Sequence, residues 1–144
     1  FEASGVWSFI GEPEKPLHEH FNELLSRIKA GDWTCIDTFS SLVNSLCKNE
    51  EDLINMLADL KRASKTGGGL HMLIVIPTMH SPRQLSIIRN KIDIVIKVSY
   101  REAGNSYIRY LKVVKSKRRP HQGIIVPFSI TRTGLVFETV TRIA

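Results

Sequence analysis

The sequence predicts an α/β fold, with a mainly parallel sheet flanked by helices and an antiparallel hairpin extension in its C-terminal third. Up to about residue 98, short apolar runs alternate with segments whose apolar residues recur at helical spacing. Strands separated by helices usually form a parallel sheet through right-handed crossovers. Beyond Gly104 only turn signals separate the strand-like runs, which is typical of antiparallel hairpins. We expect residues 1–144 to form a single domain.

The first part of the chain is expected to fold as strand, helix and strand. Val6–Ile10 is a short apolar run closed by glycine and proline residues. A helix is predicted over Leu17–Ala30, because apolar residues recur there at helical spacing, Pro16 suits its first turn and Gly31 ends it. The apolar run Trp33–Asp37 predicts the next strand, which ends in a carboxylate.

Two further helices are predicted before the next strand. Phe39–Leu46 is expected to be a turn or short helix, and Glu50–Ser64 a longer helix. Asn49 and Asp52 have the spacing of a capping box, although Asp is a weaker partner than Glu in this motif. Three glycines at 67–69 are expected to end the longer helix.

The remaining segments are predicted to be one helix and five strands. The continuous apolar run His71–Pro77 is typical of a parallel strand that is covered on both faces. A short helix is expected over Pro82–Asn90 and a further strand over Ile92–Val98. The antiparallel strands of the C-terminal third are expected at Tyr107–Val114, Ile124–Thr131 and Leu135–Thr141.

The overall composition limits which classes of ligand and which locations we expect for this protein. The chain has 20 basic and 14 acidic residues, and its formal net charge of +6 favours polyanions such as nucleotides, nucleic acid or acidic lipid surfaces without choosing among them. No apolar run approaches the roughly 20 residues needed to span a bilayer. No secretory signal is recognisable, so we expect a cytoplasmic location. The two cysteines form no disulfide scaffold, and Cys35 is expected to be a buried, reduced thiol.

The most informative polar residues follow the predicted parallel strands. Ligands of open α/β sheets bind beyond the carboxyl ends of the strands, where Asp37, Thr38 and Thr78 are expected. An apolar strand that ends in Asp and a hydroxyl residue has the pattern of a Walker B element, whose carboxylate holds Mg²⁺ beside the phosphates. The same two residues are as often simply a helix or turn cap.

A second candidate is the basic run that starts at Lys115. If the chain stays extended, Lys115 and Lys117 lie on one face and could clamp a phosphate. The run could equally be a solvated hairpin loop, or a nonspecific contact to nucleic acid through phosphate neutralisation.

Other motifs are absent from the sequence or misplaced. The segment from Lys65 to Gly69 has the letters of a P-loop in the wrong order, at the C-terminal end of a helix, whose dipole repels phosphate. The five histidines have no metal-ligand spacing, and no G-x-S-x-G nucleophile elbow occurs.

Taken in order, the segments resemble the core of RecA-superfamily ATPases, particularly the KaiC-like and RadA-paralogue group. The similarity covers about Val6 to Val140, and its specificity lies in the ordered series rather than in any single motif. The matching segments are W-T-C-I-D-T-F-S-S-L, K-T-G-G-G, H-M-L-I-V-I-P-T, K-I-D-I-V-I-K-V, R-Y-L-K-V-V-K-S-K-R-R-P-H and V-P-F-S-I-T-R-T-G-L-V-F.

The resemblance implies a role for each candidate residue. Asp37 matches the Walker B Asp that binds Mg²⁺, with Thr38 following it, and Thr78 lies near the sensor position. Lys115 and Lys117 match the basic pair that reaches the γ-phosphate of ATP on a neighbouring subunit, although Lys at 117 replaces an Arg and lacks its planar fork. Glu2 matches the Glu that polarises the attacking water, but a helix that normally follows it is missing.

The resemblance implies ATP and Mg²⁺ as ligands and a homo-oligomeric ring or filament, with ATP held between subunits. The chain contains no P-loop, which is what we expect of a RecA-like domain that lacks its N-terminal portion. ATP hydrolysis would therefore depend on a P-loop elsewhere in the intact protein. The alternative is a non-catalytic RecA-like paralogue that acts as a regulatory module or binds nucleic acid, including DNA, through its basic surface.

Overall fold

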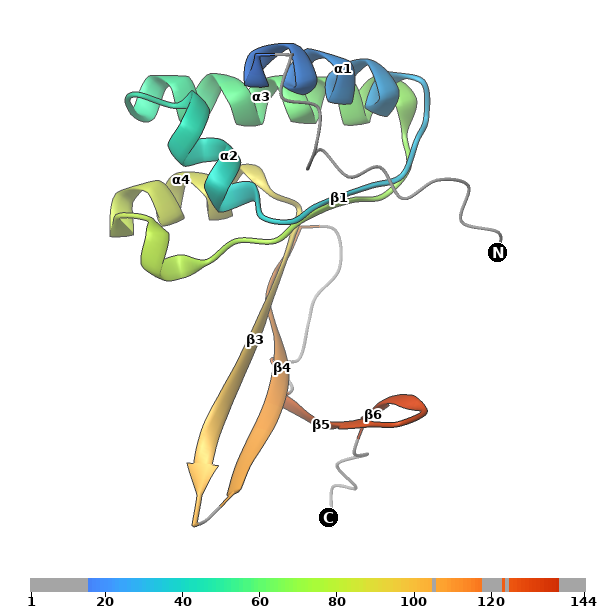
Figure 1. Cartoon of the computed structure of the whole chain (residues 1–144), viewed down its shortest axis with the longest axis vertical. Coiled ribbons are helices and arrows are strands. Elements are labelled where there is room, and N and C mark those ends of the chain that lie inside the picture. Colours follow the sequence, from blue (N-terminus) through green and yellow to red (C-terminus); the bar gives the residue numbers. More distant parts are fainter. Residues whose placement is uncertain (1–15, 105, 118–122, 124, 138–144) are drawn as a thin grey trace. The chain divides into compact units, whose positions relative to one another are not determined.

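The protein forms two compact units, residues 1–91 and residues 92–144, called here the N-terminal and C-terminal units (Figure 1). The structure is a computed structural model that describes residues 16–104, 106–117, 123 and 125–137. The strand expected at Val6–Ile10 and the last four residues of the one expected at Leu135–Thr141 lie outside these residues. Each unit is described by itself.

Over residues 16–91, the N-terminal unit contains a parallel pair of strands and four α-helices. Its elements are α1 (Leu17–Lys29), β1 (Thr34–Ile36), α2 (Phe39–Leu46), α3 (Glu50–Gly67), β2 (His71–Leu73), the 3₁₀ helix η1 (Pro77–Met79) and α4 (Pro82–Lys91). β1 and β2 run parallel, with Thr34 opposite His71 and Ile36 opposite Leu73. α2 and α3 form the crossover between the two strands, as parallel pairing requires.

The helix α3 has the start and stop signals expected from the sequence. The Asp52 amide donates to Asn49 Oδ1 at 3.0 Å, and the Asn49 amide donates to Asp52 Oδ2 at 3.2 Å, which completes the capping box. The helix ends at Gly67, and Gly68 follows with a φ of 72°, a conformation that favours glycine. The segment with P-loop letters therefore lies at a helix C-terminus, as predicted.

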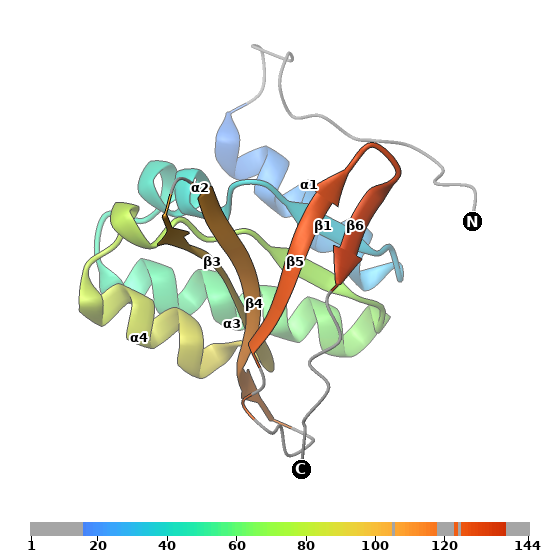
Figure 2. The ribbon, with the colours of Figure 1, turned by 90° about the horizontal axis from the view of Figure 1, so that it is seen from below.

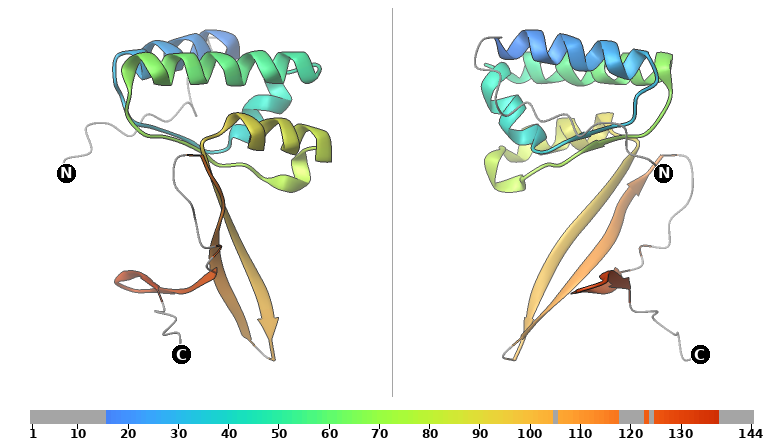
Figure 3. Two further views of the ribbon diagram at one scale, coloured as in Figure 1. Left: turned by 180° about the vertical axis from the view of Figure 1, so that it is seen from behind. Right: turned by 45° about the vertical axis from the view of Figure 1, so that its right-hand side comes forward.

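The core of the N-terminal unit lies among its helices. α1 and α3 lie side by side, as the views in Figures 1 and 3 agree. The apolar residues that recur at helical spacing in α3 are buried, and so is one side of α1, α2 and α4. The buried apolar residues are Leu24, Ile28, Phe39, Val43, Leu53, Met56, Leu57, Leu60, Ala63 and Ile88. Tight helix packing thus fixes the loops that leave β1 and β2.

The described residues of the C-terminal unit form a four-stranded antiparallel sheet (Figure 2). Its strands follow chain order: β3 (Ile94–Ala103), β4 (Ser106–Ser116), β5 (Ile125–Thr131) and β6 (Gly134–Phe137). Val95 is opposite Lys115 but Ile96 is opposite Val113, so Val114 is the extra residue of a β-bulge. The α/β prediction with an antiparallel C-terminal extension is confirmed.

Three details of the sequence-based expectation were wrong. The strand expected at Ile92–Val98 as part of a parallel sheet pairs antiparallel with the next strand, because only two residues separate β3 from β4. The run His71–Pro77 forms a strand over only three residues, and Met72 and Ile74 in and beside it are 52% and 38% exposed. Cys35 is exposed rather than buried, because a two-stranded sheet leaves much of each strand uncovered.

Candidate functional site

Asp37 and Thr38 lie directly after β1, at the carboxyl end of the parallel pair. The Asp37 side chain is exposed, and the peptide bond between the two residues is cis. Thr38 is the N-cap of α2: its Oγ1 accepts a hydrogen bond from the Ser41 amide at 3.1 Å and lies 2.8 Å from Ser41 Oγ. The cap anticipated for this pair is therefore formed by Thr38, which leaves the Asp37 carboxylate directed to solvent.

Thr78 lies in η1, on the segment that follows β2, and is exposed. The backbone continues to pair beyond the two strands: the Ile74 amide donates to the Ile36 carbonyl at 3.0 Å, and the Phe39 amide to the Ile74 carbonyl at 2.9 Å. The segments after β1 and β2 therefore leave the same end of the parallel pair. The structure places Asp37, Thr38 and Thr78 on these two segments.

Ser40 connects the same two segments through its side chain. Its buried hydroxyl oxygen accepts a hydrogen bond from the Ile76 amide at 2.8 Å and lies 2.8 Å from Nε2 of His80. Burial lowers the pKa of His80, since desolvation disfavours the charged imidazolium. Nδ1 of this ring is buried without a hydrogen-bond partner among the described residues.

The sequence-based analysis did not identify Ser40 and His80. Ser40 stands in the same D-T-F-S segment as Asp37, but its partner is 40 positions away along the chain. The only signal in the sequence was that His80 follows closely after the apolar run His71–Pro77. That position does not indicate which residue its side chain contacts.

Lys115 and Lys117 belong to the C-terminal unit. Lys115 lies in β4 opposite Val95, and the Lys117 amide donates to the Asp93 carbonyl at 2.9 Å. The chain bends at Lys117, just past the end of β4, so the placement of both lysines on one face that an extended chain would give does not reach Lys117. Lys117 Nζ is 3.9 Å from Asp93 Oδ1, and both side chains are mostly exposed, so this ion pair is weak. Glu2 lies outside the described residues.

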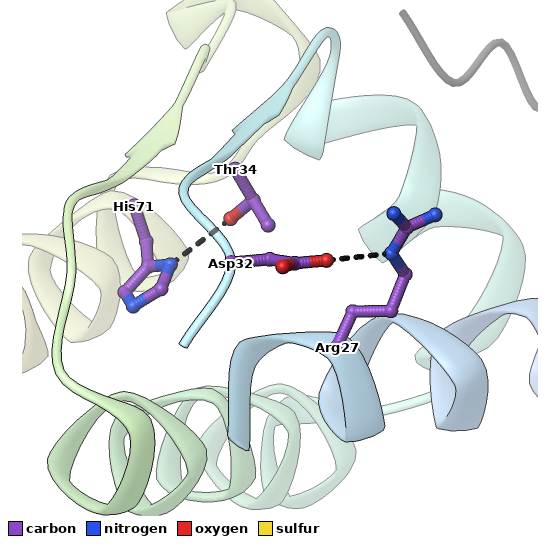
Figure 4. Close-up of polar contacts among 4 residues, drawn as sticks. All are labelled: Arg27, Asp32, Thr34 and His71. Atoms are coloured by element: carbon purple, nitrogen blue, oxygen red, sulfur yellow. Dashed lines mark hydrogen bonds and ion pairs between the residues drawn. The ribbon is translucent and has the colours of Figure 1, made fainter. Parts of the chain in front are cut away.

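The opposite end of the parallel pair is held by structural contacts (Figure 4). Thr34 Oγ1 lies 3.1 Å from Nδ1 of His71, whose Nε2 lies 2.8 Å from the Gly68 carbonyl oxygen. Arg27 Nε donates to Asp32 Oδ2 at 2.8 Å. These contacts tie the start of each strand to the helix before it, and they account for these polar side chains.

A metal ion held by the described residues would need further ligands, such as water or a phosphate group. Among the described residues, no group of three or more His, Cys, Asp or Glu side chains could hold one. Asp37 offers a single exposed carboxylate. Mg²⁺ commonly binds one or two carboxylates, water and the phosphates of a nucleotide, and Asp37 fits that mode. No helix among the described residues is long and apolar enough to cross a membrane.

Comparison with solved structures identifies the fold. The chain is similar to flagellar accessory protein FlaH from Methanocaldococcus jannaschii, with a TM-score of 0.66 and 18% identity over 83% of this chain and 54% of that one. It is also similar to a KaiC-like protein from Pyrococcus horikoshii OT3, with a TM-score of 0.68 and 22% identity over 94% of this chain and 60% of that one. No family model matches the chain, and no curated protein matches it in sequence.

The chain therefore has the RecA-like fold of KaiC-like proteins. It spans 54% and 60% of the lengths of the two neighbours. At these levels of identity the similarity establishes the fold only. The chemical function has to be inferred from the side chains of this protein.

Proposed function

We propose that this chain is the body of a RecA-like ATPase of the KaiC-like and RadA-paralogue group. It would bind Mg-ATP between subunits and couple the nucleotide to assembly or to remodelling of a DNA or protein partner. The observation that carries this function is the exposed Asp37 carboxylate at the carboxyl end of a parallel strand, with the Thr78 segment leaving the same end.

In this function Asp37 holds Mg²⁺, through water or directly, beside the β- and γ-phosphates. Thr38 keeps its side chain fixed as the cap of α2, and Thr78 offers a hydroxyl near the phosphates. Mg²⁺ supplies charge neutralisation on the phosphates. The role of the chain is to place one carboxylate and two hydroxyl groups at the end of the parallel pair.

Lys115 and Lys117 are proposed to act on ATP held by a neighbouring subunit of a ring or filament. Their positions two residues apart, in and just past the last residues of β4, suit contact with the γ-phosphate. The exposed pair with Asp93 holds Lys117 only weakly, so a phosphate can replace the carboxylate. A lysine lacks the bidentate fork of arginine, so activation by Lys117 is expected to be modest. Glu2 is proposed as the base that polarises water.

The phosphate cradle has to come from outside the 144 residues, because the sequence has no G-x-x-x-x-G-K-[ST] motif. We therefore propose that the residues form one RecA-like domain together with a preceding P-loop portion of the intact protein. A cytoplasmic location is part of the same proposal. The 144-residue chain alone is expected to bind ATP weakly.

The test is ATP turnover by the intact protein with Asp37→Asn. Loss of the carboxylate charge should remove most Mg²⁺-dependent hydrolysis. Asp32→Asn is the matched control, since Asp32 pairs with Arg27 at the opposite end of β1 and its loss should leave turnover unchanged. Unchanged turnover in Asp37→Asn would reject the function.

The same preparations also test the alternative, a non-catalytic module that binds nucleic acid. Such a module should bind DNA with an affinity that falls steeply as salt rises, because phosphate contacts release counterions. Its DNA binding should not respond to nucleotide. That result, together with no turnover in the wild-type protein, would replace the ATPase function with the alternative.

A further inference from the structure

We propose, on the basis of the function proposed above, that Ser40 and His80 are positioning residues that hold the turn carrying Thr78 in place relative to Asp37. Neither residue is expected to touch the nucleotide. Ser40 lies in the first turn of α2 and is fully buried. Its hydroxyl contacts the residue before η1 and the residue after it.

One hydroxyl group clamps the two ends of the turn. Ile76 is the last residue before η1, and its amide donates to Ser40 Oγ at 2.8 Å. His80 is the first residue after η1, and its Nε2 lies 2.8 Å from the same oxygen. Within η1 itself the backbone bonds are few: Met79 N to the Ile76 carbonyl at 3.1 Å and His80 N to the Pro77 carbonyl at 3.2 Å. A three-residue turn of this kind depends on outside contacts for its position.

The Ile76 amide can only donate, so the Ser40 oxygen accepts from it. The contact of this oxygen with Nε2 of His80 is compatible with both neutral tautomers: the hydroxyl donates to a ring protonated at Nδ1, or the oxygen accepts a second bond from a ring protonated at Nε2. In both tautomers Nδ1 is buried and has no partner among the described residues. Such a buried polar group destabilises a protein, and an apolar side chain would avoid the penalty. The contact with Ser40 is the reason we assign for an imidazole at this position.

The clamp is attached to the Asp37 side of the site by rigid links. Thr38 caps α2, and Phe39, which is fully buried, donates its amide to the Ile74 carbonyl at 2.9 Å. Ser40 follows in the first turn of α2 and so has little freedom to move. The turn that carries Thr78 is consequently attached to the first turn of α2, which begins two residues after Asp37.

The first experiment measures amide hydrogen exchange in the intact protein. Ser40→Ala should raise the exchange rates of the Met79 and His80 amides on the order of tenfold, because η1 opens locally more often. Amides in the interior of α3 should exchange at wild-type rates. Ser26→Ala makes the same chemical change at an exposed serine and should alter neither set.

Two His80 variants separate positioning from general packing. His80→Gln keeps a polar atom near the place of Nε2 and should retain wild-type exchange at Met79, whereas His80→Leu should behave like Ser40→Ala. Equal exchange of the Met79 and His80 amides in wild type and Ser40→Ala would overturn the assignment. An increase at η1 no larger than that in α3 would do the same, since it would reflect only global destabilisation.

The link to function is measured in the intact protein with Mg²⁺ and a fluorescent ATP analogue. Ser40→Ala and His80→Leu should weaken binding or turnover about tenfold, with recovery in His80→Gln. If η1 opens in Ser40→Ala while nucleotide binding is unchanged, the positioning role is rejected. If the wild-type protein binds no nucleotide, the proposed function fails, and the exchange rates alone decide whether Ser40 and His80 fix the turn.

Discussion

Gly67, in the last turn of α3, packs directly against the backbone of Ile28 in α1. A β-carbon at position 67 would overlap the Ile28 carbonyl oxygen, and it would lie 2.8 Å from the Lys29 carbonyl oxygen and 2.9 Å from the Gly31 nitrogen. The residue does not need a left-handed conformation, so its requirement for glycine is one of space. α1 and α3 approach each other this closely where the chain turns into β1 and β2.

Gly67→Ala is therefore expected to destabilise the protein. Within a helix this change is normally stabilising, because alanine has the higher helix propensity. Here the backbone atoms of α1 cannot rotate away, so the helices must separate, and overpacking of this kind lowers the unfolding free energy by about 1–3 kcal/mol. Urea unfolding followed by circular dichroism measures the change.

The matched control for this glycine lies in the same helical turn. Thr66 is exposed and donates its hydroxyl to the Arg62 carbonyl, so Thr66→Ala should change stability by less than about 0.5 kcal/mol. A Gly67→Ala protein at least as stable as the wild type would show that α1 and α3 are not in such close contact.

The helices were predictable because their signals are local. Asn49 and Asp52 are three positions apart and satisfy each other's backbone amides, so the start of α3 is encoded within one turn. Leu53 and Leu57 recur at helical spacing, so the buried face of α3 can likewise be predicted without knowing which residues it packs against. Asp37 at the end of a short apolar run identified the end of β1 in the same way.

Pairing between distant segments was not predictable. No local pattern shows that Ser40 contacts His80, or that β3 pairs antiparallel with the strand after it. The exposure of Cys35 also depends on what lies beside β1, and not on the apolar run that contains it. Such contacts depend on tertiary structure, which a single sequence does not encode in its spacing.

The unfolding free energy should fall as the pH is lowered through the range in which His80 titrates. Burial lowers the pKa of His80 in the folded protein from its usual value of 6.5. Below pH 6.5 the unfolded chain therefore takes up a proton that the folded protein still excludes, so stability falls until the pH reaches the folded-state pKa. Urea midpoints measured from about pH 8 to pH 5 test this dependence.

His80→Gln is the reference for that titration. It cannot take up a proton at this position, and it leaves every other residue of the chain unchanged. The difference between wild type and variant should therefore shrink or reverse in favour of the variant as the pH falls. Parallel pH profiles for the two proteins would contradict the lowered pKa of His80.

The two cysteines should differ in their reactivity toward thiol reagents. Burial, with a smaller contribution from the nearby Asp52 carboxylate, raises the pKa of Cys47, whose Sγ also lies 4.0 Å from Met56 Sδ. Cys35 is exposed. Because the thiolate is the reactive form, Cys35 should be alkylated about tenfold faster than Cys47 at neutral pH. Mass spectrometry of Cys35→Ser and Cys47→Ser proteins measures each rate separately, and equal rates would contradict the difference in environment.

Thr38→Ala should separate the capping role of this residue from its proposed role in binding nucleotide. Loss of the Oγ1 acceptor leaves the Ser41 amide without its cap, which should lower the unfolding free energy by about 1 kcal/mol, whereas Thr38→Ser should retain the bond. Asn49→Ala removes the corresponding cap of α3 and serves as the matched control, with a similar loss of stability. At a temperature where all variants are folded, weaker Mg-ATP binding by the intact protein in Thr38→Ala alone would reveal a contribution of its hydroxyl to the site. Equal binding in Thr38→Ala and Asn49→Ala would assign Thr38 to the cap and leave Asp37 as the group that holds Mg²⁺ after β1.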